Sequence, residues 1–193
     1  MSSALLVSTG VISLAEIGDK TQLLAFLLAT RFKKPVPIII GITLATLINH
    51  GLAGVLGAWI TANISPETLR WVLGISFLAM AAWTLIPDKI ENEETQLATK
   101  LGVFGATFVT FFLAEMGDKT QIATVAMSAH YADVVMVVAG TTLGMLIADV
   151  PAVFAGDKLS QKIPMKLVHS IAAGMFALLG LATLLGLGSN FGF

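Results

Sequence analysis

Long apolar stretches run along most of the chain, and short polar or proline-containing breaks separate them. Read by length, these stretches predict six helical segments, at about 4–30, 36–61, 69–86, 101–129, 134–156 and 168–187. Pro35, Pro37, Pro66, Pro87 and Pro164 mark the breaks. Because about 20 apolar residues in a helix suffice to cross the hydrocarbon core of a bilayer, each segment is a candidate membrane span.

The composition favours a membrane protein and excludes several other classes. Of the 193 residues, 56% are hydrophobic and only 12% are charged, whereas an average soluble domain has about 25% charged residues. A soluble enzyme is therefore nearly excluded. The net charge of −1 offers no basic surface to nucleic acid. The lack of cysteine excludes a disulfide framework and a thiolate metal site.

Basic residues are divided unequally between the two sides of the predicted membrane. One side receives Arg31, Lys33, Lys34, Lys89, Lys100, Lys158, Lys162 and Lys166, and the other receives Arg70. The side rich in lysine and arginine is predicted to be cytoplasmic, which places both termini on the outer side. The polar stretch 88–100 is interpreted as a cytoplasmic linker between a first unit, 1–87, and a second unit, 101–193.

One charged motif occurs twice in the chain. Leu14–Gln22 reads Leu-Ala-Glu-Ile-Gly-Asp-Lys-Thr-Gln and Leu113–Gln121 reads Leu-Ala-Glu-Met-Gly-Asp-Lys-Thr-Gln, and identities such as Gly41 with Gly140 keep the same register. The chain is therefore predicted to contain two copies of a three-helix unit. Because three is odd, the second copy crosses the membrane in the opposite direction. The predicted fold is an all-α integral membrane protein with six transmembrane helices arranged as two inverted three-helix repeats.

Both motifs lie near the centres of their predicted spans, where each ionisable side chain exposed to lipid costs about 2.5–3.5 kcal/mol. The glutamate, aspartate and lysine of each motif are predicted to share one helix face, and the two faces to meet at the bilayer midplane. The predicted cation-binding residues are Glu16, Asp19, Gln22, Glu115, Asp118 and Gln121, with the four acids as the metal ligands. Supporting roles are assigned to Gly18, Lys20, Thr21, Gly117, Lys119 and Thr120. The threonines reach the site only if the helices unwind near the two glycines.

Hard oxygen donors without sulfur or imidazole suit Mn²⁺, Ca²⁺ or Mg²⁺. Four carboxylates and two lysines give the predicted site a net charge of about −2 when all are ionised. One divalent cation or a pair of protons would neutralise that charge, so the predicted chemistry is cation/proton exchange. The alternative is that Glu16–Lys20 and Glu115–Lys119 are structural ion pairs along single helices.

Two further polar residues occupy equivalent positions in the second and fifth segments. His50 lies nearer the predicted outer side and Asp149 nearer the cytoplasm, so one interpretation is a proton relay with a gate on each face. The other interpretation is structural: His50 packs with Asn49, and Asp149 marks a helix break before Pro151.

The paired string Glu-x-Gly-Asp-Lys-Thr resembles the Gdt-type divalent-cation/proton exchangers, once called uncharacterised protein family sixteen. The resemblance covers essentially the whole chain and maps the acids of the family motif onto Glu16, Asp19, Glu115 and Asp118. It implies exchange of Ca²⁺ or Mn²⁺ for protons, with no cofactor beyond the transported cation. The short form of the chain resembles bacterial manganese exporters of the inner membrane. The expected function is Mn²⁺ export by alternating access, with a Ca²⁺/proton antiporter as the alternative and the oligomeric state left open.

Three other functions are weaker readings of the same motif. The excess negative charge disfavours an amino-acid exporter, whose substrate carries a carboxylate. An intramembrane aspartyl protease also places two aspartates beside glycines, but Lys20 and Lys119 would stabilise both carboxylates in the ionised form. A passive channel would carry metal without responding to a pH gradient.

Overall fold

The computed structural model describes residues 3–86, 101–155 and 165–186, and the regular structure in these ranges is entirely helical. The helices are α1 (Ser3–Glu16), α2 (Lys20–Phe32), α3 (Pro35–Asn63), α4 (Pro66–Thr84), α5 (Gly102–Glu115), α6 (Lys119–Tyr131), α7 (Val134–Ala155) and α9 (Met165–Leu184). The all-α class is therefore confirmed. The predicted linker 88–100 lies outside the described residues, as do Lys158 and Lys162.

The first and fourth predicted segments are each two helices rather than one. α1 ends at Glu16 and α2 begins at Lys20, while α5 ends at Glu115 and α6 begins at Lys119. The prediction that each motif forms one continuous helix face is therefore wrong. The turn between the helices requires a backbone conformation that glycine adopts readily, and Gly18 has a φ of 86°. The corresponding glycine of the second motif has a φ of 78°.

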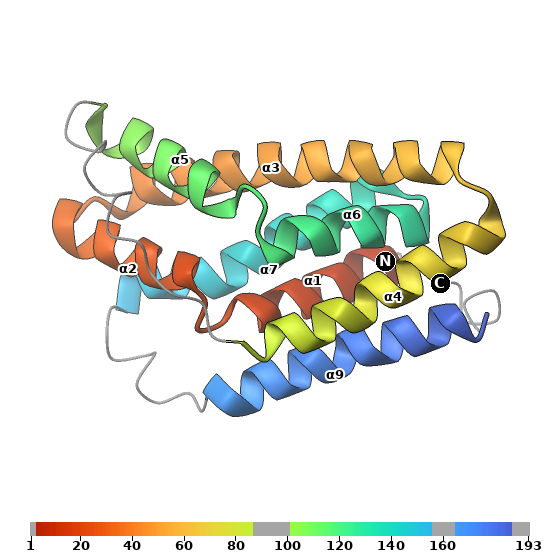
Figure 1. Cartoon of the computed structure of the whole chain (residues 1–193). Coiled ribbons are helices and arrows are strands. Elements are labelled where there is room, and N and C mark those ends of the chain that lie inside the picture. Colours follow the sequence, from red (N-terminus) through yellow and green to blue (C-terminus); the bar gives the residue numbers. More distant parts are fainter. Residues whose placement is uncertain (1–2, 87–100, 156–164, 187–193) are drawn as a thin grey trace.

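Corresponding helices of the two halves run in opposite directions (Figure 1). α1 and α2 run one way along the long axis of the molecule, and α5 and α6 run the other way. The same reversal relates α3 to α7 and α4 to α9. The chain also leaves α2 and α6 in the same way, since Lys33 and Ala132 both have a φ of 51°. These features support the predicted inverted repeat.

The number of membrane crossings remains a prediction. Within the described residues, α3 and the stretch Val134–Phe154 of α7 are long and apolar enough to cross a membrane, with 29 and 21 residues. α1 and α5 are apolar but have only 14 residues each. The breaks at the two motifs explain this shortness, because each divides one expected span into two short helices.

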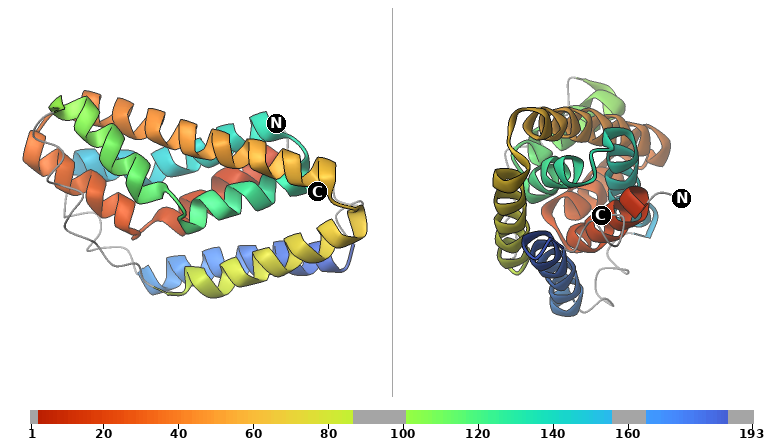
Figure 2. Two further views of the ribbon diagram at one scale, coloured as in Figure 1. Left: turned by 45° about the horizontal axis from the view of Figure 1, so that its top comes forward. Right: turned by 90° about the vertical axis from the view of Figure 1, so that its right-hand side faces the viewer.

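The buried apolar residues of the helices form two clusters. The first cluster draws on α1, α4, α6, α7 and α9. The second draws on α2, α3, α5 and α7. Each motif turn therefore joins a helix of one cluster to a helix of the other. α4 and α9 pack as a pair at one side of the bundle, and they contact α6 and α1 respectively (Figure 2).

Glycines allow α7 to pack closely on α1. A Cβ atom added to Gly140 would lie 2.6 Å from the carbonyl oxygen of Leu5, and one added to Gly144 would lie 2.9 Å from the carbonyl oxygen of Thr9. Both obstacles are backbone atoms, which cannot move without shifting a helix. By contrast, a Cβ atom added to Gly51 of α3 would meet nothing within 4 Å.

Gly140→Ala is expected to lower the free energy of unfolding by about 1–3 kcal/mol, the usual cost of overpacking a buried contact. Gly51→Ala is the matched control and should be neutral or stabilising by up to about 1 kcal/mol, because alanine favours helix more than glycine does. Thermal unfolding of the purified variants in detergent measures both effects. Equal stabilities of the two variants would contradict the close packing of α1 and α7.

Candidate functional site

The first motif forms a turn held by its own side chains. The backbone N–H of Asp19 donates to the carbonyl oxygen of Glu16 at 3.0 Å. Asp19 is the N-cap of α2, and its Oδ1 accepts from the backbone N–H of Lys20 at 2.8 Å. Gln22 reaches back and accepts from the backbone N–H of Gly18 at 2.9 Å. The string Asp-x-x-Gln thus acts as a variant of the capping box that starts a helix.

The second motif repeats this turn. The N–H of Asp118 donates to the carbonyl oxygen of Glu115 at 3.2 Å, and the N–H of Gly117 donates to Gln121 Oε1 at 2.7 Å. Asp118 is the N-cap of α6, with φ −76° and ψ 167°, close to the −81° and 171° of Asp19. The two motifs therefore share one backbone conformation, although only the Asp19 side chain accepts a cap hydrogen bond.

The two glutamines stabilise the turns, while their predicted role at the cation site stays a prediction. Both side-chain oxygens accept backbone N–H groups, and Gln22 Nε2 also donates to the carbonyl oxygen of Ala148 in α7 at 2.9 Å. Gln22 thereby ties the first motif to α7. The carboxylates remain as the groups best suited to hold a cation.

Each motif threonine hydrogen-bonds the glutamate of its own motif. Thr21 Oγ1 donates to Glu16 Oε1, and Thr120 Oγ1 donates to Glu115 Oε2 at 2.9 Å. The condition for bringing the threonines to the site is met, because both helices are interrupted at the glycines. Both glutamates are 0% exposed. The second oxygen of each, Glu16 Oε2 or Glu115 Oε1, accepts no hydrogen bond from the described part of the chain.

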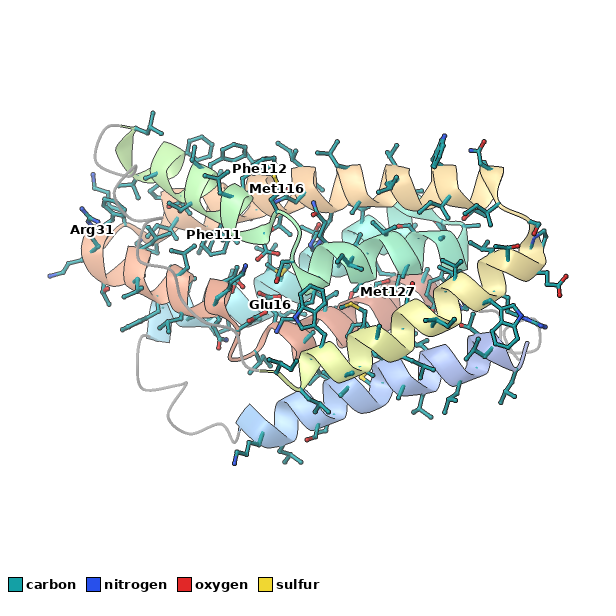
Figure 3. The ribbon with its side chains drawn as sticks, viewed as in Figure 1. Glu16, Arg31, Phe111, Phe112, Met116 and Met127 are labelled. Atoms are coloured by element: carbon teal, nitrogen blue, oxygen red, sulfur yellow. The ribbon has the colours of Figure 1, made fainter. Side chains whose placement is uncertain are left out.

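A buried carboxylate oxygen without a donor is unfavourable unless a proton or a cation occupies it. The two glutamates lie at the C-terminal ends of α1 and α5, where the helix dipole is negative and favours a cation. Figure 3 shows Glu16 at the break between α1 and α2, midway along the molecule, with Arg31 at one end.

The lysines pair across the two halves. Lys119 Nζ lies 3.3 Å from Asp19 Oδ2, and Lys20 Nζ lies 3.8 Å from Asp118 Oδ1. The alternative of ion pairs along single helices is wrong, because the turn removes each lysine from the helix that carries its glutamate. The two motifs are therefore in contact, as the sequence predicts, but through aspartate–lysine pairs.

Asp149 and His50 are both buried, with 0% exposure, on α7 and α3. Pro151 lies inside α7 without ending it, so the reading of Asp149 as a helix break is wrong. Ala148, the residue before Asp149, accepts the hydrogen bond from Gln22 Nε2, so Asp149 lies in the turn of α7 that contacts the first motif, and its oxygens accept no hydrogen bond from described residues. Asp149 therefore adds a fifth acid to the group around the motifs.

His50 is placed differently from Asp149. Its ring nitrogens have no hydrogen-bond partner among the described residues. Its neighbour Asn49 donates from Nδ2 to the carbonyl oxygen of Phe112 in α5 at 3.0 Å. The role of His50 as a proton gate stays a prediction.

The described acids do not form a complete metal-binding site in this conformation. Within the residues that the structure describes, no group of three or more His, Asp or Glu side chains is arranged to hold a metal ion. The four predicted ligands are instead shared between threonine hydroxyls and lysine ammonium groups. In this conformation the two motif aspartates face the lysine ammonium groups of the opposite motif.

Comparison with known proteins gives a consistent picture. The family model described as "Divalent cation/proton antiporter GDT1" matches residues 4–92 and 103–190, one stretch in each half. A Vibrio cholerae protein named as a candidate manganese exporter is 53% identical over 182 residues, covering 94% of this chain and 90% of its own. GDT1-like protein 3 of Oryza sativa subsp. indica is 29% identical over 198 residues, covering 90% and 70%. No solved structure matches significantly.

Proposed function

Because the chain belongs to the GDT1 family of divalent cation/proton antiporters, we propose that it exports Mn²⁺ from the cytoplasm in exchange for protons. The family consists of membrane transporters, and the similarity to a relative named for manganese export favours Mn²⁺ as the cargo. The site of exchange is the paired motif. We place it near the bilayer midplane, with both termini on the outer side of a bacterial inner membrane.

The contact between the two motifs carries this proposal. Asp19 and Asp118 belong to different halves of the chain, and each is paired with the lysine of the other half. A buried glutamate stands beside each pair with one oxygen free of hydrogen bonds from described residues. Carboxylates from two opposed half-helices thus converge on one place, which is how transporters with inverted repeats build a cation site.

Exchange follows because the divalent cation and the protons compete for the same carboxylate oxygens. A divalent cation bound by Glu16, Glu115 and the motif aspartates neutralises their charge, and it leaves when protons replace it. Thr21 and Thr120 orient the glutamates, and the glutamines preserve the turns while the ligands change. Because the two halves run in opposite directions, exchanging their conformations moves the opening of the site from one face to the other.

A Ca²⁺/proton antiporter is the second candidate. Oxygen-only sites accept Ca²⁺ as well as Mn²⁺, and selectivity between them depends on cavity size and rigidity. An intramembrane protease is less well supported, since the lysine paired with each aspartate favours ionised carboxylates over a dyad that shares a proton.

Transport in proteoliposomes tests the cargo and the coupling together. We expect an inside-acidic pH gradient to accelerate Mn²⁺ uptake, with Ca²⁺ and Mg²⁺ carried more slowly. Faster uptake of Ca²⁺ would favour the second candidate. Mn²⁺ flux that is the same with and without the gradient would indicate a passive channel. Deleting the gene should reduce growth in high manganese, and unchanged tolerance would contradict the export assignment.

A further inference from the structure

Each motif lysine forms an ion pair with an aspartate that a transported cation would need. We propose that Lys20 and Lys119 act as internal cations, each holding the aspartate of the opposite motif until a metal arrives, and that they make the site selective for divalent over monovalent ions. This inference rests on the proposed function and assigns the residues that set the charge selectivity of its site.

The pairing is reciprocal but unequal. The Lys119 and Asp19 side chains are 1% and 0% exposed, and their charged atoms lie 3.3 Å apart. The Lys20 and Asp118 side chains are 26% and 5% exposed, and their charged atoms lie 3.8 Å apart. One pair is therefore closed and buried, whereas the other is longer and reaches the surface.

The charge of the incoming ion decides whether it can displace a lysine. Electrostatic attraction to a carboxylate scales with the charge of the cation and falls with distance. Na⁺ or K⁺ replaces one unit charge by another and must also lose part of its hydration, so it gains little. A divalent ion carries twice the charge of the ammonium group and approaches carboxylate oxygens to about 2.0–2.6 Å. Only the divalent ion gains enough to open the pair.

The inequality of the pairs gives an order of events. The cation meets Asp118 first, because its partner Lys20 is partly exposed at the surface of the protein, whereas Lys119 is enclosed. Lys119 leaves Asp19 second, once the cation supplies the positive charge that Asp19 requires in a site of low polarity. When the cation departs, the lysines return, so neither aspartate is left buried without a counter-charge. The lysines are thus parts of the exchange cycle.

The alternative is that the lysines only tie the two halves together. Under both roles, removing a lysine impairs the function of the protein. The two roles differ in the effect that they predict on Mn²⁺ binding. A structural tie predicts weaker Mn²⁺ binding and unchanged discrimination against Na⁺. An internal cation predicts tighter Mn²⁺ binding, because its competitor is gone, together with new inhibition by Na⁺.

Mn²⁺ titration of the purified full-length protein, with and without a large excess of Na⁺, separates the two roles. Lys20→Gln is the first variant because Lys20 is partly exposed. Lys20→Arg keeps the charge, and Lys34→Gln removes a lysine far from the motifs along the chain. We expect Lys20→Gln to lower the apparent Kd for Mn²⁺ by about tenfold and to let Na⁺ inhibit binding. Lys34→Gln should behave as wild type, and Lys20→Arg, which keeps the positive charge, should keep the resistance to Na⁺.

Lys119→Met repeats the test at the buried pair, and we expect the same direction of change. Wild-type Mn²⁺ affinity and wild-type resistance to Na⁺ in Lys20→Gln would overturn this inference, as would weaker Mn²⁺ binding in that variant. If the wild-type protein itself bound no Mn²⁺ or Ca²⁺, the proposed function would fail and this inference with it. The two failures are therefore distinguishable.

Discussion

Glu115→Gln is expected to abolish metal/proton exchange. Glutamine keeps the shape of the side chain and an oxygen for Thr120, but it removes the negative charge and the oxygen that can take up a proton. Changes merely around a metal site cost about 10–100-fold in affinity or activity. Loss of a ligand should therefore slow Mn²⁺ uptake driven by a pH gradient by more than about 100-fold. Proteoliposomes containing the purified variant provide the measurement.

Two further variants are compared with Glu115→Gln. Glu16→Gln should lose exchange to the same extent, because Glu16 has the equivalent hydrogen bond to Thr21 and the same burial. Glu67→Gln, an exposed position in the first turn of α4, should retain wild-type exchange. Exchange at the wild-type rate in Glu115→Gln and Glu16→Gln would refute the assignment of the glutamates to the site.

Asp19→Asn is expected to lower the free energy of unfolding by about 3–5 kcal/mol, the cost of leaving one partner of a buried ion pair without its counter-charge. The Lys119 side chain is 1% exposed, so its ammonium group is buried in this conformation. Asp118→Asn should cost less than Asp19→Asn, because its partner Lys20 is 26% exposed and lies farther from the carboxylate.

Thermal and denaturant-induced unfolding in detergent measures both aspartate variants. The comparison is informative because both substitutions are the same and both occur at the N-cap of a half-helix. An equal loss of stability in the two variants would show that the pairs are equally buried in solution. That result would contradict the unequal pairing on which the order of cation access depends.

The boundaries of the helices follow largely from the sequence. The predicted segment 36–61 corresponds to Pro35–Asn63, and 134–156 corresponds to Val134–Ala155. Proline is tolerated in the first turn of a helix, and it disfavours helical conformation in the residue before it. The lengths of the apolar stretches and the proline at the start of α3 therefore locate these ends well.

The interruption at each motif was not predicted, although the sequence contains a signal for it. A glycine followed by Asp-x-x-Gln is typical of a helix end followed by a new capped start. The apolar residues on both sides of the motif hide this signal, because together they have the length of one membrane span. The sequence consequently gives no indication that the glutamines stabilise these turns, and their role as ligands stays a prediction.

The partners of the lysines could not be predicted from sequence periodicity. The pairs Lys119–Asp19 and Lys20–Asp118 join residues from different halves, so they depend on how the halves pack. Spacing along one helix instead favours Glu16–Lys20. The hydrogen bond from Gln22 to Ala148, which joins the first motif to the turn of α7 that contains Asp149, is likewise a tertiary contact, and the equivalence of Asp149 to His50 in the repeat gives no indication of it.

The central claim is that one site couples divalent cation movement to proton movement. Its most direct test is an imposed inward Mn²⁺ gradient across proteoliposomes of the wild-type protein, with equal pH on both sides and a pH-sensitive dye trapped in the lumen. Coupled exchange predicts that the lumen becomes alkaline as Mn²⁺ enters, and that Glu115→Gln liposomes show neither change. Entry of Mn²⁺ into wild-type liposomes without a change of luminal pH would contradict the account.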